Sequence, residues 1–139
     1  MKGISTLVRL HKQELDERRV ALRVLEDARG RLLARQRCLE EEFAAEREKA
    51  ATSIEVRYAL PAYTQAVATR RGEITRAKAE LAKEIDRARA AVAEAFQRFK
   101  RYEITQTRWS LRAAAEERNR EQKGLDDIAI DMFRRSQRT

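Results

Sequence analysis

The sequence contains few of the residues that break helices or build reactive sites. Its 139 residues include one proline, four glycines, one cysteine and one histidine. A single cysteine excludes a disulfide within the chain, and together with one histidine it cannot supply the four ligands of the usual zinc site. There is also no glycine-rich loop of the kind that binds phosphate groups. The sequence therefore predicts a protein without a metal or a cofactor.

Long hydrophobic runs are also absent. No apolar stretch approaches the ~20 residues that a transmembrane helix needs. The opening, MKGISTLVRLHK, lacks the continuous apolar core of a secretory signal. We therefore expect a cytoplasmic protein.

The two residue types most often found in catalytic sites have ordinary structural interpretations here. His11 falls within the first helical pattern described below, and Cys38 lies beside that pattern with no basic cluster or base nearby to activate its thiol. Carboxylates are abundant, but two helices alone offer no pocket that would exclude water and separate their pKa values. We expect no enzymatic activity, and hence a mechanical or recognition function.

What the chain does contain is charge and helix-forming residues. Charged side chains make up 39% of it, and Ala, Leu, Glu, Arg and Lys dominate, which is typical of coiled coils and long helices. The formal net charge of +8 is distributed unevenly, with +2 over residues 1–60, +5 over 61–109 and +1 over 110–139. A basic surplus favours an acidic partner, which could be protein, nucleic acid or anionic lipid.

Apolar residues recur at helical spacing in both halves of the chain. In the first half, steps of four and three residues from Ile4 reach twelve positions, of which eight are apolar. In the second half, thirteen positions from Val67 to Trp109 include nine apolar ones, or ten with Tyr102. A period of 3.5 residues is the seam of a left-handed coiled coil. We therefore predict two long helices, over residues 3–50 and 61–135.

This rhythm fails between the two seams, in the stretch ATSIEVRYALP. Pro61 lacks the backbone donor of an interior helix position and is favoured at the first position of a helix. Thr52 and Glu55 have the spacing of a capping box, so a helical turn could begin at Thr52. We interpret residues 51–61 as the turn and Pro61 as the start of the second helix. A continuous helix kinked at Pro61 is the alternative.

The two seams are in register for an antiparallel pair. If the chain folds back near residue 56, partners have residue numbers that sum to 113 or 114. The predicted pairs include Leu39 with Ile74, Leu32 with Leu81, Gln36 with Lys78, His11 with Tyr102 and Ile4 with Trp109. The predicted fold class is therefore all-α, with one domain, residues 1–139, that forms a long two-helix antiparallel coiled-coil hairpin. Pairing of the seams between two chains is the alternative.

The second helix extends beyond the first. Once Ile4 has met Trp109, residues 110–139 have no partner in the chain, so we predict an overhanging C-terminal helix. Its end has an apolar face with the spacing i, i+3, i+4 and i+7, followed by two arginines that complement the helix dipole. The residues concerned are Leu125, Ile128, Ala129, Met132, Phe133, Arg134 and Arg135. We interpret them as a docking helix that enters a groove on a partner; a frayed tail loosened by Gly124 is the alternative.

One short stretch combines basic and aromatic residues. FQRFKRY, residues 96–102, has the composition of surfaces on which single-stranded nucleic acid stacks. Phe99 and Tyr102, however, belong to the seam, which would hide their faces. We favour a packing role, and a basic coiled coil that binds nucleic acid is the alternative function.

Three stretches resemble a known family. The opening LVRLHKQELDERRVALRVLEDARGRL is similar to the first helix of the flagellar export chaperone (FliJ) family, with its short basic start and heptads. The closing REQKGLDDIAIDMFRR resembles the C-terminal segment of that family, an acidic pair followed by Ile-Ala and a Phe–Arg end. The segment from Tyr63 to Ile74 is similar in placement.

The resemblance implies an architecture and a set of partners. It implies an antiparallel coiled-coil hairpin similar to the rotor stalk of rotary ATPases, peripheral to the inner membrane as part of the flagellar type III export apparatus. It also implies association with the export ATPase hexamer and the membrane export-gate protein, and a link to the escort of export chaperones. The equivalent stalk of a virulence type III secretion system is an alternative of the same architecture.

The resemblance also implies site residues. By position, the residues that would engage the ATPase ring are Leu125, Ile128, Met132, Phe133, Arg134 and Arg135. Tyr63 and Val67 lie on the stretch where contact with the export gate is expected. Family members often have larger apolar residues in that stretch, where this chain has Ala66 and Arg70.

Overall fold

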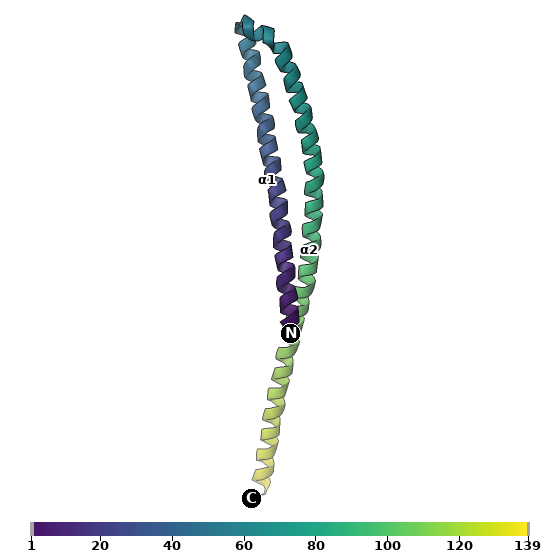
Figure 1. Cartoon of the computed structure of the whole chain (residues 1–139). Coiled ribbons are helices and arrows are strands. Elements are labelled where there is room, and N and C mark those ends of the chain that lie inside the picture. The colour runs from purple at the N-terminus through teal and green to yellow at the C-terminus, as the bar shows by residue number, and fades with distance from the viewer. Residues whose placement is uncertain (1, 139) are drawn as a thin grey trace. The chain divides into compact units, whose positions relative to one another are not determined.

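The computed structural model describes residues 2–138 and consists of two helices (Figure 1). Helix α1 spans Lys2–Thr52 and helix α2 spans Ile54–Gln137. Both are rich in Ala, Leu, Glu, Arg and Lys, which lose little side-chain freedom in a helix. The helices pack against each other as a hairpin, which confirms the predicted all-α fold of two long antiparallel helices.

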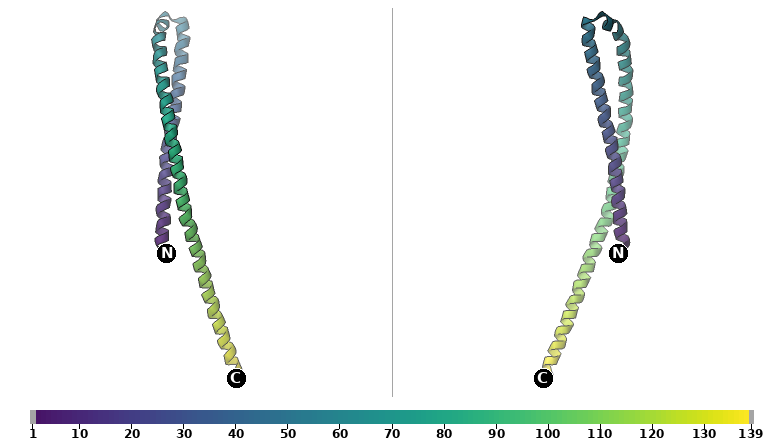
Figure 2. Two further views of the ribbon diagram at one scale, coloured as in Figure 1. Left: turned by 90° about the vertical axis from the view of Figure 1, so that its right-hand side faces the viewer. Right: turned by 60° about the vertical axis from the view of Figure 1, so that its left-hand side comes forward.

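The chain divides into two compact units, and each contains a segment of both helices. The first unit comprises Met1–Gln13 and Phe96–Thr139, and the second comprises Glu14–Ala95. Within each unit the two helical segments lie side by side (Figures 1 and 2).

In the second unit, the seam residues are buried as the periodicity predicts. Leu39, Val67 and Ile74 form a buried cluster that joins α1 to α2. Each buried aliphatic side chain of this size stabilises the pair by about 1.5–3 kcal/mol. The residues packed around the cluster are Leu32, Phe43 and Tyr63. One polar seam pair is also formed as predicted, because Nζ of Lys78 donates a 3.3 Å hydrogen bond to Oε1 of Gln36.

An ion pair beside this cluster links the two helices. The guanidinium of Arg71 donates two hydrogen bonds of 2.6 Å to the carboxylate of Glu40, from Nε to Oε1 and from Nη2 to Oε2. The same guanidinium lies 5.0 Å from the ring centroid of Phe43. The hydrogen bonds hold the pKa of Glu40 below its usual value and raise the pKa of Arg71, because they favour the charged form of each group.

In the first unit, the start of α1 packs on the middle of α2. The rings of His11 and Tyr102 stack with centroids 4.5 Å apart, as the register predicts. Oγ of Ser5 accepts a 3.0 Å hydrogen bond from Nε2 of Gln106. Beyond this contact α2 continues past the N-terminal end of α1 (Figure 1), and all described residues from 107 to 138 except Ala115 are exposed. The predicted C-terminal overhang is therefore confirmed.

The break between the helices is shorter than the predicted turn. Ser53 alone separates α1 from α2, whereas we expected residues 51–61 to form the connection. The N–H of Ser53 donates to the carbonyl of Lys49 at 2.9 Å, and the carbonyl of Ser53 accepts from the N–H of Arg57 at 3.1 Å. Ser53 therefore takes part in the hydrogen bonding of both helices. A connection of more than one residue is not needed between them.

Side chains satisfy the backbone groups that this tight corner exposes. Oγ of Ser53 accepts a 3.4 Å hydrogen bond from the N–H of Val56, so Ser53, one residue after the predicted Thr52, caps the start of α2. The guanidinium of Arg57 donates to the carbonyls of Ala50 (3.1 Å) and Ala51 (3.3 Å). These carbonyls are among the acceptors that the end of a helix leaves without an intrahelical partner.

Pro61 lies inside α2 and not at its start, so this prediction was wrong. A proline here cannot donate a hydrogen bond to the carbonyl of Arg57, and its ring crowds that carbonyl, so it bends the helix without ending it. The start of α2 lies at an angle to the rest of the helix (Figure 1). The alternative of a helix kinked at the proline describes α2 correctly. The chain reverses in two steps, first at the break at Ser53 and then where the start of α2 bends into the rest of the helix.

Candidate partner-binding surfaces

An apolar face near the C-terminal end of α2 is open to solvent. Its four large side chains are between 58% (Ile128) and 65% (Met132) exposed, and its alanine is exposed as well. The spacing i, i+3, i+4, i+7 and i+8 places all five on one side of the helix. We refer to this surface as the C-terminal face, and it comprises Leu125, Ile128, Ala129, Met132 and Phe133.

Charged residues border the C-terminal face. Arg134 and Arg135 lie in the last turn of α2 and are exposed. Their positive charge complements the negative end of the helix dipole, which supports helical structure to the end of α2 at Gln137. Ile130, which the sequence analysis did not single out, is 50% exposed and lies about 140° around the helix from Leu125, outside the face.

The two residues expected near the export gate lie in the seam of the second unit. Val67 is only 2% exposed and belongs to the buried cluster. Tyr63 is half-buried against the same cluster, with its ring centroid 6.0 Å from that of Phe43. Of the two, only Tyr63 retains accessible surface for a partner while the helices stay paired.

Two exposed side chains at the start of α2 were missed by the sequence analysis. Ile54 is 73% exposed and Tyr58 is 87% exposed, and the spacing i, i+4 places them on the same side of the helix. The sequence did contain a sign of this surface, since several β-branched and aromatic residues lie close together within residues 51–61. It was hidden because that stretch was interpreted as a turn.

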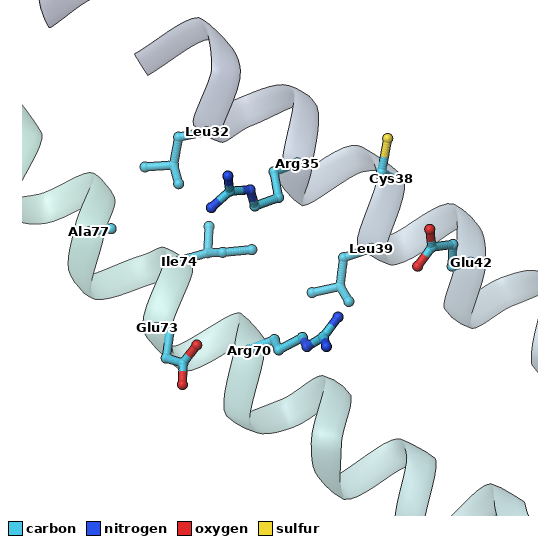
Figure 3. A pocket seen from close by; sticks show the side chains of 9 residues that line it. All are labelled: Leu32, Arg35, Cys38, Leu39, Glu42, Arg70, Glu73, Ile74 and Ala77. Carbon is cyan, nitrogen blue, oxygen red and sulfur yellow. The ribbon is translucent and has the colours of Figure 1, made fainter. Parts of the chain in front are cut away.

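A shallow groove of about 520 Å³ runs between the helices of the second unit (Figure 3). The seam residues Leu39 and Ile74 lie in it, and the side chains of Arg35 and Arg70 extend across the space between the helices. The sulfur of Cys38 points away from α2. The groove is lined by Leu32, Arg35, Cys38, Leu39, Glu42, Arg70, Glu73, Ile74 and Ala77.

The residues considered for chemistry belong to different units and occupy ordinary positions. His11 stacks on Tyr102 in the first unit, and Cys38 is exposed in the second unit. Among residues 2–138, no group of three or more His, Cys, Asp and Glu side chains is arranged to hold a metal ion.

The aromatic residues of FQRFKRY are occupied by packing. Phe99 is 9% exposed, and the ring of Tyr102 stacks on His11. Phe96 is more exposed, but Nζ of Lys100 lies 5.8 Å from its ring centroid. The seam position predicted for Phe99 and Tyr102 is therefore confirmed, and this stretch does not present free rings in a row.

Comparison with known proteins decides between the alternative identities. The family described as Flagellar FliJ protein matches residues 1–138, which is nearly the whole chain. The chain belongs to the flagellar FliJ protein family. No curated protein and no solved structure matches it.

Membership of the FliJ family makes this chain a component of the flagellar export apparatus. Members of the family are generally non-catalytic components of that apparatus. Within the part of the FliJ-family chain that the structure describes, neither helix has a stretch long and apolar enough to cross a bilayer.

Proposed function

We propose that this FliJ-family chain is a non-enzymatic stalk that links the hexameric export ATPase to the membrane export gate. It acts on the cytoplasmic side of the inner membrane, where it is held by protein contacts, and it also escorts export chaperones. The ATPase contact is made by Leu125, Ile128, Met132, Phe133, Arg134 and Arg135.

The observation that supports this proposal best is the exposure of the C-terminal face. In the second unit, seam side chains such as Leu39, Val67 and Ile74 are buried between the helices. In the C-terminal face, four large apolar side chains are exposed to solvent on a well-formed helix. A helical face of this kind is suited to a hydrophobic groove on another protein. The two arginines at its end add charge that can orient the helix within such a groove.

The second contact, with the export gate, is proposed to lie in the second unit, near Tyr63. Val67 lies beneath Tyr63 in the buried cluster, so its contribution is to support the contact from within the seam. Two contacts on one molecule raise the effective concentration of each partner for the other, so each can be weak by itself.

The test is a binding measurement with the purified export ATPase. We expect deletion of residues 125–139 to abolish binding to the ATPase ring while the circular dichroism of the remaining hairpin stays helical. Undiminished binding by the truncated chain would rule the proposal out.

Point variants of the full chain make the test more specific. The double variant Ile128→Ser, Met132→Ser removes two apolar contacts, and we expect it to weaken ring binding by about tenfold or more. Ile130→Ser is the matched control for the single variant Ile128→Ser, since it makes the same change on the same helix outside the C-terminal face. Equal losses from both variants would show that the face is not the contact surface.

A further inference from the structure

The net charge of the chain is concentrated in one short pair of helical segments. Residues 1–13 and 96–112 of the first unit carry eight Lys or Arg and one acidic residue, Glu103, so they hold +7 of the net charge of +8. The rest of the first unit, residues 113–139, has six basic and six acidic residues, and the second unit has seventeen and sixteen. The charge is therefore a local feature of this paired segment.

Basic and apolar side chains alternate along the outer surface of α2 in this segment. Arg101, Ile104, Arg108 and Leu111 follow the spacing i, i+3, i+7 and i+10, so they form one line along the helix, and all four are exposed. Ile104 is 48% exposed and Leu111 is 64% exposed. Arg112 is exposed next to this line, beside Leu111.

The start of α1 extends this surface. Ser5 bonds to Gln106, and Nζ of Lys12 lies 5.8 Å from the ring centroid of Phe99, so these two residues mark one side of the seam. Leu7 and Leu10 are each two residues away from them and therefore lie about 200° around α1, on the opposite side. Both leucines are exposed.

The arginines of this surface have no acidic neighbour to neutralise them, apart from Glu116 one turn beyond Arg112. Some exposed arginines of the hairpin do pair with a carboxylate, as in Arg89 with Glu26 and Arg120 with Glu117. Among the described residues, no ion pair includes Arg101, Arg108 or Arg112. Arg108 and Arg112 also have the spacing i, i+4, which is mildly unfavourable for like charges. An uncompensated surface of this kind is suited to a negative charge supplied from outside.

We propose that this surface is a docking site for an acidic amphipathic helix of another protein. Its residues, here called the arginine–leucine surface, are Leu7, Leu10, Arg101, Ile104, Arg108, Leu111 and Arg112. The alternation along α2 fits a helix whose Leu or Ile residues contact Ile104 and Leu111 while its Asp or Glu residues meet the guanidinium groups. The site shares no residue with the C-terminal face or with the stretch around Tyr63.

The composition of the surface distinguishes this partner from others. A second copy of the chain would bring arginine against arginine, so charge complementarity argues against self-association here. The line on α2 uses arginine and not lysine, and arginine is enriched in protein interfaces because its planar fork binds a carboxylate with two parallel hydrogen bonds. Nucleic acid would use the positive charge but would leave the four aliphatic side chains uncovered.

The test uses the full-length chain and a synthetic helical peptide as the probe. The peptide has leucine at every third or fourth position, flanked by glutamate. One control peptide has serine in place of leucine, and another has lysine in place of glutamate. Binding is measured by fluorescence anisotropy of the labelled peptide, at low and at high salt. We expect the leucine–glutamate peptide to bind about tenfold or more tightly than either control, with an affinity that falls as salt rises.

Charge-reversed variants locate the site. We expect Arg101→Glu, Arg108→Glu to lower the affinity for the leucine–glutamate peptide by about tenfold or more. The control Arg23→Glu, Arg76→Glu makes the same change in net charge in the second unit, away from the surface, and should leave the affinity within about threefold, the difference expected from long-range charge alone. Unchanged helicity in both variants excludes unfolding as the cause of a loss.

Three results would overturn the proposal. The first is equal binding of the leucine and serine peptides, which would mean that only charge is recognised. The second is equal loss of affinity in the two charge-reversed pairs. The third is tighter binding, through Arg101 and Arg108, to duplex DNA or to phosphatidylglycerol vesicles than to the peptide. None of these outcomes depends on the ATPase, so they are separate from the test of the proposed function.

Discussion

At the corner of the hairpin, individual side chains satisfy the backbone groups at the two helix ends. Ser53 caps the start of α2 through its hydroxyl, and Arg57 reaches back to two carbonyls at the end of α1. Both contacts are short-range in sequence, so the corner can form as soon as these residues are helical. The stability of the corner is therefore sensitive to a few single substitutions.

Replacing the capping serine tests this directly. We expect Ser53→Ala to lower the free energy of unfolding by about 1 kcal/mol, because the N–H of Val56 loses its acceptor. The hydroxyl of Thr52 only donates to the carbonyl of Lys49 at an exposed site, so Thr52→Ala should change the free energy by less than about 0.5 kcal/mol. Urea unfolding followed by circular dichroism compares the two, and equal effects would contradict the assignment of Ser53 as the cap.

The pair between Glu40 and Arg71 predicts a pH dependence. Because the hydrogen bonds from Arg71 depress the pKa of Glu40 in the folded state, Glu40 contributes stability above its unfolded pKa. That contribution is lost as the pH falls through the lower folded pKa. We expect Arg71→Gln to lower the melting temperature at neutral pH. The difference from the wild type should shrink in acid, where the contact of Arg71 with the ring of Phe43 remains.

A titration of the carboxyl carbon of Glu40 by nuclear magnetic resonance gives the independent measurement. In the Arg71→Gln variant, the pKa of Glu40 should rise toward its usual value. The same pKa in both proteins would show that the pair is not formed in solution.

At the scale of the helices, Pro61 is tolerated where most sequences would place another residue. A proline in a helix interior is about 3 kcal/mol less favourable than alanine. Replacing it by alanine also raises the conformational entropy of the unfolded chain, which lowers the gain in stability by about 1 kcal/mol. We therefore expect Pro61→Ala to raise the free energy of unfolding by about 2 kcal/mol and to increase the helical signal. A loss of stability would instead show that the bend in α2 is needed for its packing on α1.

The two apolar surfaces of α2 should respond differently to truncation. Leu39→Ala removes a buried contact of the seam, and we expect a cost of about 2–3 kcal/mol. Leu125→Ala removes an exposed side chain of the C-terminal face, so its cost should stay below about 0.5 kcal/mol. Urea unfolding of both variants measures the contrast, and comparable costs would mean that the C-terminal face is already covered.

The elements were predictable where the sequence repeats and unpredictable where it does not. The seam pairs Leu39 with Ile74 and His11 with Tyr102 follow from a period of 3.5 residues, because antiparallel packing links every pair to the next. The corner depends on one hydroxyl and one guanidinium, which leave no periodic trace. Pro61 misled the prediction because its preference for a helix start is a statistical tendency, and packing of the following residues outweighs it.

At the scale of the whole molecule, the hairpin requires that the seam be covered within one chain. In a Cys38→Ser background, spin labels at Arg35→Cys and Ala77→Cys, which both line the groove of the second unit, should give a short distance. The distance should persist when labelled chains are mixed with an excess of unlabelled chain. Its disappearance on dilution would show that two chains pair instead.

The candidate sites were predictable in part. The C-terminal face follows from spacing alone, because an apolar stripe beyond the last paired residue has nothing to cover it. Burial of Val67 and exposure of Tyr58 could not be assigned without knowing where the chain reverses. The arginine–leucine surface was missed because it combines segments 1–13 and 96–112, which are adjacent only after folding.

The single-residue corner at Ser53 also sets the order in which the molecule can close. Across the helices, Glu40 and Arg71 are separated by 31 residues, whereas Ser5 and Gln106 are separated by 101. Contacts near the corner therefore need the shortest length of synthesised chain and cost the least loop-closure entropy. We expect them to form first, and the contacts farther from the corner to form after them. The first dozen residues leave the ribosome earliest yet find their partner last, so within the paired part of the hairpin we expect their amide hydrogens to exchange with solvent first.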